Sequence, residues 1–355
     1  MAIEASGKMR FDFAEEIRSC AGADVDWTKL DNRTILISGS TGLVGKYLIM
    51  SLLERNRIYG VHTHIIAMGR EKSKFCCRFD DCEGIGSVEF LEHDVQQPLA
   101  YEKRIDYILH MASNTHPRLY ASKPIETEMA NILGTLHLLE LASSKPGCRF
   151  LFTSSTDIYG DNRSGKQFLE EMDCGYIDCN TLRAGYIEGK RASEALCNAY
   201  REEKGVDFVI ARLCRLYGPT MQRPDSRAIS QFIDKAVGRE DIVLTSRGTQ
   251  TFSHLYVYDA VTALLRIMTS GETGNAYNVA DKDQAPALRE LAQKLADIAG
   301  TKVVFDLPDE LVAKGASTFQ DVRLDPSKLY ALGWRPTVSL EEGLRHTVEY
   351  FRAAM

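Results

Sequence analysis

A glycine-rich segment between a short apolar run and a helical pattern constrains this chain more than any other feature. Thr34–Ser38 (TILIS) has the composition of a buried strand, and residues 43–53 have helical periodicity. Glycines between such elements permit a tight turn, bring a diphosphate close to the backbone and let the helix pack on the strand. The segment predicts a dinucleotide site formed by Gly39, Thr41, Gly42, Leu43, Val44 and Gly45.

Strand-like and helical patterns alternate along the following 160 or so residues. Such alternation predicts an α/β fold, a Rossmann-type doubly wound parallel sheet with helices on both faces. We expect an N-terminal extension (1–33), a dinucleotide-binding domain with the catalytic residues (34–216), and a smaller mixed α/β region (217–355) that is mainly substrate-binding, with some returns to the dinucleotide-binding domain. The expected strands are 34–38, 63–68, 88–92, 105–110, 149–154 and 207–213; the expected helices include 11–20, 121–144 and 182–204.

Composition narrows the function classes. The net charge is −6 and there is no basic run, which argues against nucleic-acid binding. No apolar run approaches the roughly 18 residues of a membrane span, and the first residues lack the apolar core of a signal peptide, so we expect a cytoplasmic protein. The nine cysteines lack the spacing of zinc ligands, and we expect no metal.

A tyrosine and a lysine four residues apart are the candidate catalytic pair. Tyr186 and Lys190 would share one helix face, where the ammonium favours the phenolate. Tyr200 and Lys204 form a second such pair, but they lie about 21 Å further along the same helix at 1.5 Å per residue. Ser155 ends a predicted strand at the sheet edge where active sites form, and this favours Tyr186.

The remaining cofactor markers follow the ends of other strands. Arg70 stands after the second strand, where an NAD site usually has an acidic residue. It could meet a 2′-phosphate, stack on adenine or simply lie on the surface, so we expect NAD and keep NADP as the alternative. Further contacts to the cofactor are expected from Asp94, Val95, Ala112, Ser113 and Thr153.

Together these motifs resemble the extended short-chain dehydrogenases/reductases, the NAD-dependent epimerase/dehydratase family. The resemblance spans residues 34–352 and is most specific at 183–191, 211–212 and 217–219, which are similar to UDP-glucuronate decarboxylases. It implies a triad of Ser155, Tyr186 and Lys190, hydride abstraction from a sugar carbon, usually C4, and a 4-keto intermediate. It also implies a homodimer formed through helices 121–144 and 182–204.

The chain departs from the family pattern near the expected substrate. Thr156 and Asp157 occupy the places of the Asp-Glu pair of dehydratases, which disfavours dehydration. Phe252 replaces a family arginine, and Arg215 replaces an asparagine. We therefore expect a relocated phosphate or carboxylate contact, with a nucleotide-diphosphate sugar bound by Thr115, Thr156, Asp157, Arg215 and Arg227.

Four functions remain open at this stage. The leading hypothesis is 4-epimerisation of a nucleotide sugar, because it requires no acid beyond the triad. The alternatives are decarboxylation of a nucleotide-linked uronic acid, an NADPH-dependent keto-sugar reduction, and a cofactor-binding scaffold without turnover. The nucleotide base, the sugar and the stereochemical outcome are not fixed by the sequence.

Overall fold

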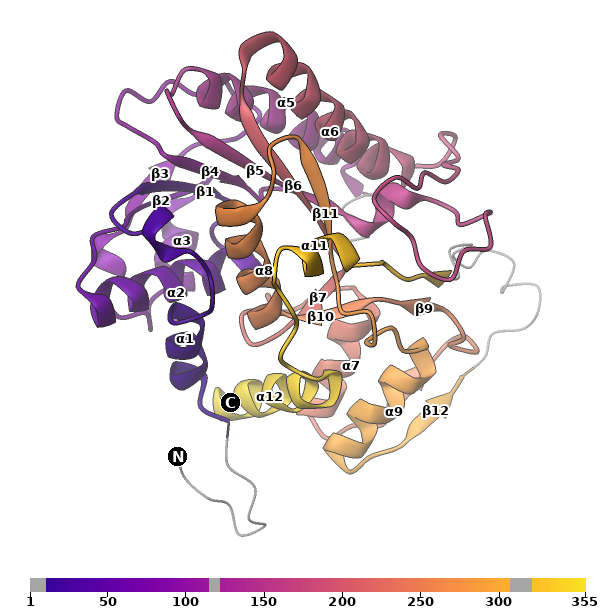
Figure 1. Cartoon of the computed structure of the whole chain (residues 1–355). Coiled ribbons are helices and arrows are strands. Elements are labelled where there is room, and N and C mark those ends of the chain that lie inside the picture. The colour runs from indigo at the N-terminus through magenta and orange to yellow at the C-terminus, as the bar shows by residue number, and fades with distance from the viewer. Residues whose placement is uncertain (1–10, 115–121, 307–320) are drawn as a thin grey trace.

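The computed structural model describes residues 11–114, 122–306 and 321–355. Its centre is a seven-stranded parallel sheet in the order β11-β6-β5-β4-β1-β2-β3 (Figure 1). Chain order reverses between β1 and β4, which leaves a crevice at the carboxyl edge of the sheet. The strands are β1 (Thr34–Ser38), β2 (His64–Gly69), β3 (Glu89–Glu92), β4 (Tyr107–His110), β5 (Arg149–Ser155), β6 (Asp207–Leu213) and β11 (Asn275–Val279).

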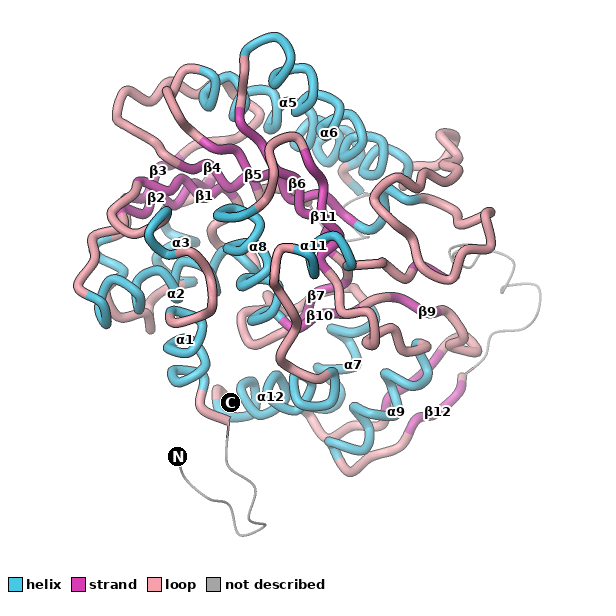
Figure 2. Tube along the Cα trace, viewed as in Figure 1, coloured by secondary structure: helices cyan, strands magenta, loops and turns pink. Residues whose placement is uncertain are grey.

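Helices cover both faces of this sheet, as Figure 2 shows. Alternate β1 side chains enter different cores: Leu36 faces α5 (Pro124–Ser143) and α6 (Ala184–Lys204), whereas Ile35 and Ile37 face the opposite layer. That layer contains α2 (Leu43–Tyr59), α3 (Lys72–Arg78) and α8 (Val257–Ser270). The predicted doubly wound α/β fold is confirmed.

Two helix boundaries differ from the sequence prediction for local reasons. The helix expected from residue 121 begins at Pro124, whose fixed φ suits a first helical position. The helix expected to end near residue 53 continues to Tyr59 and stops at Gly60, which adopts a left-handed φ of 64°.

The C-terminal region has its own core and three small parallel ladders. The helices among its described residues include α7 (Ala228–Val237), α9 (Leu288–Ala299), α11 (Ser327–Ala331) and α12 (Leu340–Ala353). The ladders pair β7 (Arg215–Tyr217) with β10 (His254–Tyr256), β8 (Ile242–Leu244) with β12 (Val303–Phe305), and β9 (Thr251–Phe252) with β13 (Asp321–Val322). Although they follow residue 217, α8 and β11 belong to the main sheet layers.

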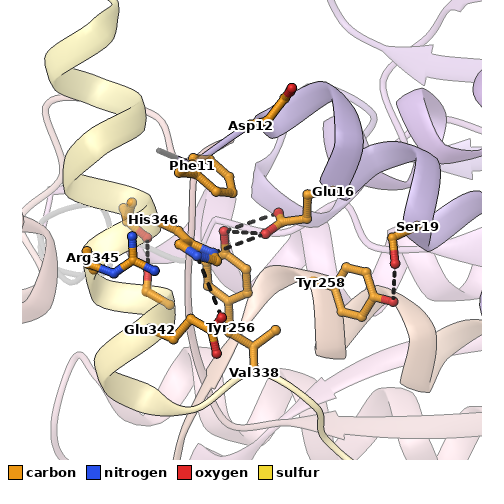
Figure 3. Close-up of polar contacts among 12 residues, drawn as sticks. Phe11, Asp12, Glu16, Ser19, Tyr256, Tyr258, Val338, Glu342, Arg345 and His346 are labelled. Atoms are coloured by element: carbon orange, nitrogen blue, oxygen red, sulfur yellow. Dashed lines mark hydrogen bonds and ion pairs between the residues drawn. The ribbon is translucent and has the colours of Figure 1, made fainter. Parts of the chain in front are cut away.

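The N-terminal helix α1 (Phe13–Ala21) joins the two regions (Figure 3). Its Glu16 carboxylate accepts hydrogen bonds from the Tyr47 hydroxyl of α2 at 2.8 Å and the Tyr256 hydroxyl at 3.0 Å. His346 Nδ1 of α12 lies 3.4 Å from the same carboxylate, and the Phe11 ring stacks on His346. The helix expected over residues 11–20 is present, and it packs on the body of the protein.

Candidate active site

One cavity of about 720 Å³ opens at the carboxyl edge of the central sheet. Residues that follow β1, β2, β3, β4 and β5 line one side, and residues of the C-terminal region line the other. Thr115 lies outside the described residues. The cavity wall includes every other predicted site residue: Gly39, Thr41, Gly42, Leu43, Val44, Gly45, Arg70, Asp94, Val95, Ala112, Ser113, Thr153, Ser155, Thr156, Asp157, Tyr186, Lys190, Arg215 and Arg227.

The glycine loop has the shape that a dinucleotide diphosphate requires. Gly39 has a φ of 73°, and a Cβ there would lie 2.8 Å from the backbone of Met111 and Ala112. A Cβ on Gly45 would lie 2.9 Å from the Ser40 backbone, so that α2 could not pack as closely on β1. Gly42 precedes the first turn of α2, whose free amide groups face the cavity end that would hold the diphosphate.

Tyr186 and Lys190 are brought to the cavity by α6. Tyr186 is 5% exposed and Lys190 is 3% exposed. The Lys190 ammonium donates a hydrogen bond to the Thr153 carbonyl at 2.8 Å, which ties α6 to the end of β5. Burial lowers the pKa of Lys190 to about 7, and the negative charge of Glu194 opposes this shift. An ammonium this easily discharged is suited to moving protons near neutral pH.

Ser155 is positioned by the turn that follows β5. Its Oγ accepts a hydrogen bond from the Asp157 backbone at 3.1 Å and caps the short helix Thr156–Tyr159. The neighbouring hydroxyls of Ser154 and Thr156 are buried in the cavity wall with no hydrogen-bond partner among the described residues. Buried hydroxyls without partners at a cavity surface are suited to binding a polar ligand.

The second tyrosine–lysine pair has a different environment. The Tyr200 hydroxyl and the Lys204 ammonium both donate to Glu140 Oε2 of α5, each at 2.8 Å. Neither residue lines the cavity. Tyr186 and Ser155 therefore line the same cavity, whereas Tyr200 lies on the α5–α6 surface.

Arg70 lies at the end of the cavity where adenosine would bind. Its guanidinium pairs with Glu126 Oε1 at 2.9 Å, and Lys123 pairs with the other oxygen of Glu126 at 2.9 Å. The Arg70 side chain is 60% exposed, so its charge remains accessible to a ligand phosphate. On the other side of this end, Val95 packs against Gly134 of α5.

The opposite end of the cavity is rich in arginine. Arg183 pairs with Asp157 at 3.5 Å, and Arg227 pairs with Asp225 at 2.5 Å. Arg215 has no ion pair or side-chain hydrogen bond with any described residue, and its guanidinium lies over the ring of Phe252. Burial lowers the pKa of Arg215 to about 10, although the nearby Asp157 raises it.

The sequence interpretation gave no site role to several polar residues of the cavity wall, among them Arg183, Gln222, Gln250 and His254. Arg183 was part of the family motif but received no role. Gln250, Phe252 and His254 lie in or beside the short strands β9 and β10, which are too short for a period-two pattern to reveal them. No local signal marks Gln222.

A family of known proteins matches most of this chain. The model of the NAD dependent epimerase/dehydratase family matches residues 35–280. The chain belongs to this family. It is therefore an NAD-dependent enzyme, and the resemblance inferred from its motifs is confirmed.

Its relatives include decarboxylases. The chain is 33% identical over 322 residues to UDP-glucuronic acid decarboxylase 1 of Xenopus tropicalis, covering 91% of this chain and 73% of the relative. It is 33% identical over 329 residues to UDP-glucuronic acid decarboxylase 3 of Arabidopsis thaliana, covering 90% of each.

Solved structures share the fold at lower identity. UDP-glucose 4-epimerase of Thermotoga maritima superposes with a TM-score of 0.75 at 23% identity, covering 90% of this chain and 99% of that one. The dTDP-glucose 4,6-dehydratase DesIV of Streptomyces venezuelae, solved with NAD bound, gives a TM-score of 0.75 at 23% identity and covers 90% and 97%.

Among the described residues there is no helix long and apolar enough to span a membrane. The same residues contain no cluster of three side chains that could hold a metal ion.

Proposed function

We propose that this enzyme decarboxylates a nucleotide-linked uronic acid after oxidising its sugar at C4. The observation that carries the proposal is the Arg215 guanidinium, a partly buried cation that forms no ion pair with any described residue and lies in the wall that also holds Ser155 and Tyr186. A buried charge is costly unless an opposite charge compensates it, and a sugar carboxylate would do so. Similarity to two UDP-glucuronic acid decarboxylases over at least 90% of the chain supports the same reaction.

The triad performs the proposed oxidation. Tyr186 removes the proton of the C4 hydroxyl, and the Lys190 ammonium on the same helix face favours the phenolate that this requires. Ser155 holds the sugar oxygen by a hydrogen bond. Bound NAD supplies the acceptor for the C4 hydride and later its donor.

Decarboxylation then follows from the position of the new carbonyl. The C4 ketone is β to the carboxylate, so the bond between C5 and the carboxyl carbon breaks, CO₂ leaves and its electron pair forms an enolate. C5 must next accept a proton that comes from solvent, and we assign its delivery to Asp157, which stands beside Ser155 in the cavity wall and takes up a further proton from water before the next turnover. Reduction of C4 and return of the Tyr186 proton complete the cycle.

A 4-epimerase is the second candidate, and one observation favours it. The Asp157 carboxylate forms an ion pair with Arg183 at 3.5 Å and is therefore engaged by a cation of the protein rather than directed at the sugar alone. Epimerisation needs only the triad and a sugar that turns over in its site.

The deciding experiment supplies NAD-loaded enzyme with UDP-glucuronate labelled with ¹³C in the carboxyl group. We expect labelled CO₂ and a nucleotide pentose by mass spectrometry. Parallel samples contain UDP-glucose, UDP-N-acetylglucosamine, and the dTDP-, CDP- and GDP-linked sugars. Epimerisation of a neutral nucleotide sugar, with the UDP-glucuronate left unchanged, would contradict decarboxylation. Stoichiometric consumption of NADPH would indicate a reductase.

A further inference from the structure

The segment between β7 and α7, residues 218–227, contacts the cofactor loop directly. Thr220 Oγ1 donates a hydrogen bond to the Leu43 carbonyl at 2.7 Å, and Gln222 Nε2 donates to the Thr41 carbonyl at 2.8 Å. Both acceptors belong to the glycine loop. Thr220 is 1% exposed, so its hydroxyl has no access to water as an alternative partner.

Arg78 of α3 reinforces the same junction. Its Nε donates to the Thr41 carbonyl at 3.3 Å, and its terminal nitrogen donates to the Thr220 carbonyl. The Arg78 side chain thus joins the glycine loop to the segment from a third element. Hydrogen bonds donated by Thr220, Gln222 and Arg78 therefore fix the first half of this segment relative to the glycine loop.

The far end of the segment presents a cation to the cavity. The Asp225 carboxylate accepts from the Arg227 backbone at 2.9 Å and from Arg227 Nε at 2.7 Å. Arg227 directly precedes α7 and lines the cavity, as does Gln222. One short segment is therefore anchored on the cofactor loop and ends at an arginine available to the substrate phosphates.

We propose that Thr220 and Gln222 are positioning residues that couple the two ligands, so that bound NAD increases the affinity for the nucleotide part of the substrate. This proposal depends on the proposed function in one respect only, which is that the substrate carries a nucleotide. NAD fixes the backbone of the glycine loop. The carbonyls of Thr41 and Leu43 then hold Gln222 and Thr220 in place, and less freedom remains to be lost when Arg227 binds a diphosphate.

Because coupling between two binding sites is reciprocal, the nucleotide must strengthen NAD binding by the same factor. The test titrates nucleoside diphosphates without a sugar into the full chain, with and without saturating NAD, by calorimetry. The probe is whichever of UDP, dTDP, CDP and GDP binds the wild-type protein most tightly. Turnover plays no part in this measurement, so a failed decarboxylation assay leaves it interpretable.

We expect NAD to tighten nucleotide binding about fivefold or more in the wild-type protein. Gln222→Met, similar in length but unable to donate to Thr41, should bring this ratio close to one, and Thr220→Val should lower it. Gln293→Met, at an exposed glutamine of α9, is the matched control and should keep the wild-type ratio.

A purely structural role would weaken nucleotide binding equally with and without NAD and leave the ratio unchanged. The proposal is overturned by that result, by a wild-type ratio of one, or by the absence of binding for all four nucleotides. If the melting temperature of Gln222→Met is well below that of the wild type, the affinity ratio measured for Thr220→Val decides whether the proposal holds.

Discussion

The guanidinium carbon of Arg215 lies 3.4 Å from the centroid of the Phe252 ring. Arg215 on β7 pairs with His254 on β10, and Phe252 precedes His254 by two residues. The two positions at which the chain departs from its family's arginine and asparagine are therefore in contact. Arg215 therefore places a guanidinium beside the position at which the family pattern has its arginine, which supports the proposed decarboxylation.

Arg215→Asn should raise the KM of the nucleotide-sugar substrate about 10- to 100-fold, which corresponds to about 1.4 to 2.8 kcal/mol. The reason is the loss of a charged partner for a desolvated anion. Steady-state kinetics will check this.

The double variant Arg215→Asn/Phe252→Arg is the sharpest companion experiment. It returns a guanidinium from position 252 and should recover most of the lost affinity. An unchanged KM in Arg215→Asn would show that Arg215 does not meet the substrate.

Tyr186→Phe should reduce turnover about 10²- to 10⁴-fold, because the variant lacks the hydroxyl that removes the substrate proton. NAD binding and the melting temperature should remain close to those of the wild type. Tyr200→Phe is the matched control, since it removes only the hydrogen bond to Glu140 on the helix surface. Loss of activity in Tyr200→Phe with retention in Tyr186→Phe would reverse the assignment.

Arg70→Ala should weaken NADP(H) more than NAD(H), by about two- to fivefold, the size expected for an exposed charge pair. Glu126→Gln offers the complementary change, because it frees Arg70 from its 2.9 Å ion pair and should strengthen NADP(H) binding. Titration of both dinucleotides into both variants checks the pair. Equal effects on the two cofactors would mean that Arg70 does not reach the 2′-phosphate.

The stability of the NAD-free protein should depend on pH through Lys190. Its folded-state pKa of about 7 is below the free value of 10.5, so between these values the unfolded chain binds more protons. Stability from this residue is complete above about pH 10.5 and is lost as the pH falls towards 7, with a slope of at most about 1.4 kcal/mol per pH unit. The free energy of unfolding, measured with urea at several pH values, should rise with pH between 7 and 10.5 more steeply in the wild type than in Lys190→Met, by this slope. An equal pH dependence in the two proteins would contradict the prediction.

Glu16→Gln should destabilise the protein by about 1–3 kcal/mol, because two buried tyrosine hydroxyls share this carboxylate. Burial raises the pKa of Tyr47 and Tyr256 well above 10, so both phenols remain donors. Glu15→Gln, at an exposed position of the same helix, is the control and should have little effect. Thermal unfolding of the two variants provides the comparison, and equal melting temperatures would leave Glu16 without this role.

The sequence predicts six strands of the central sheet because each of these carries its own signal, whereas β11 (Asn275–Val279) was not predicted. The apolar runs of β1 and β6 and the glycines after β1 act locally, and parallel strands necessarily bring Gly39, Asp94 and Ser155 to one edge. The short ladders escaped prediction because β9 has two residues, too few for a period. Contacts such as Gln222 with Thr41 join residues 181 positions apart, and only the packed fold creates them.

The Glu16 junction has a consequence for how the chain is made. The helix α1 emerges from the ribosome early, but its hydrogen bond to Tyr256 spans 240 residues and that of the Phe11 backbone to Glu349 spans 338. Loops of this length close slowly, and the bond from Phe11 to Glu349 cannot form until α12 has been synthesised. The core contacts of α1 with α2 can form earlier, because both helices lie within the first 59 residues. The attachment of α1 to α12 is therefore expected to be a late folding event.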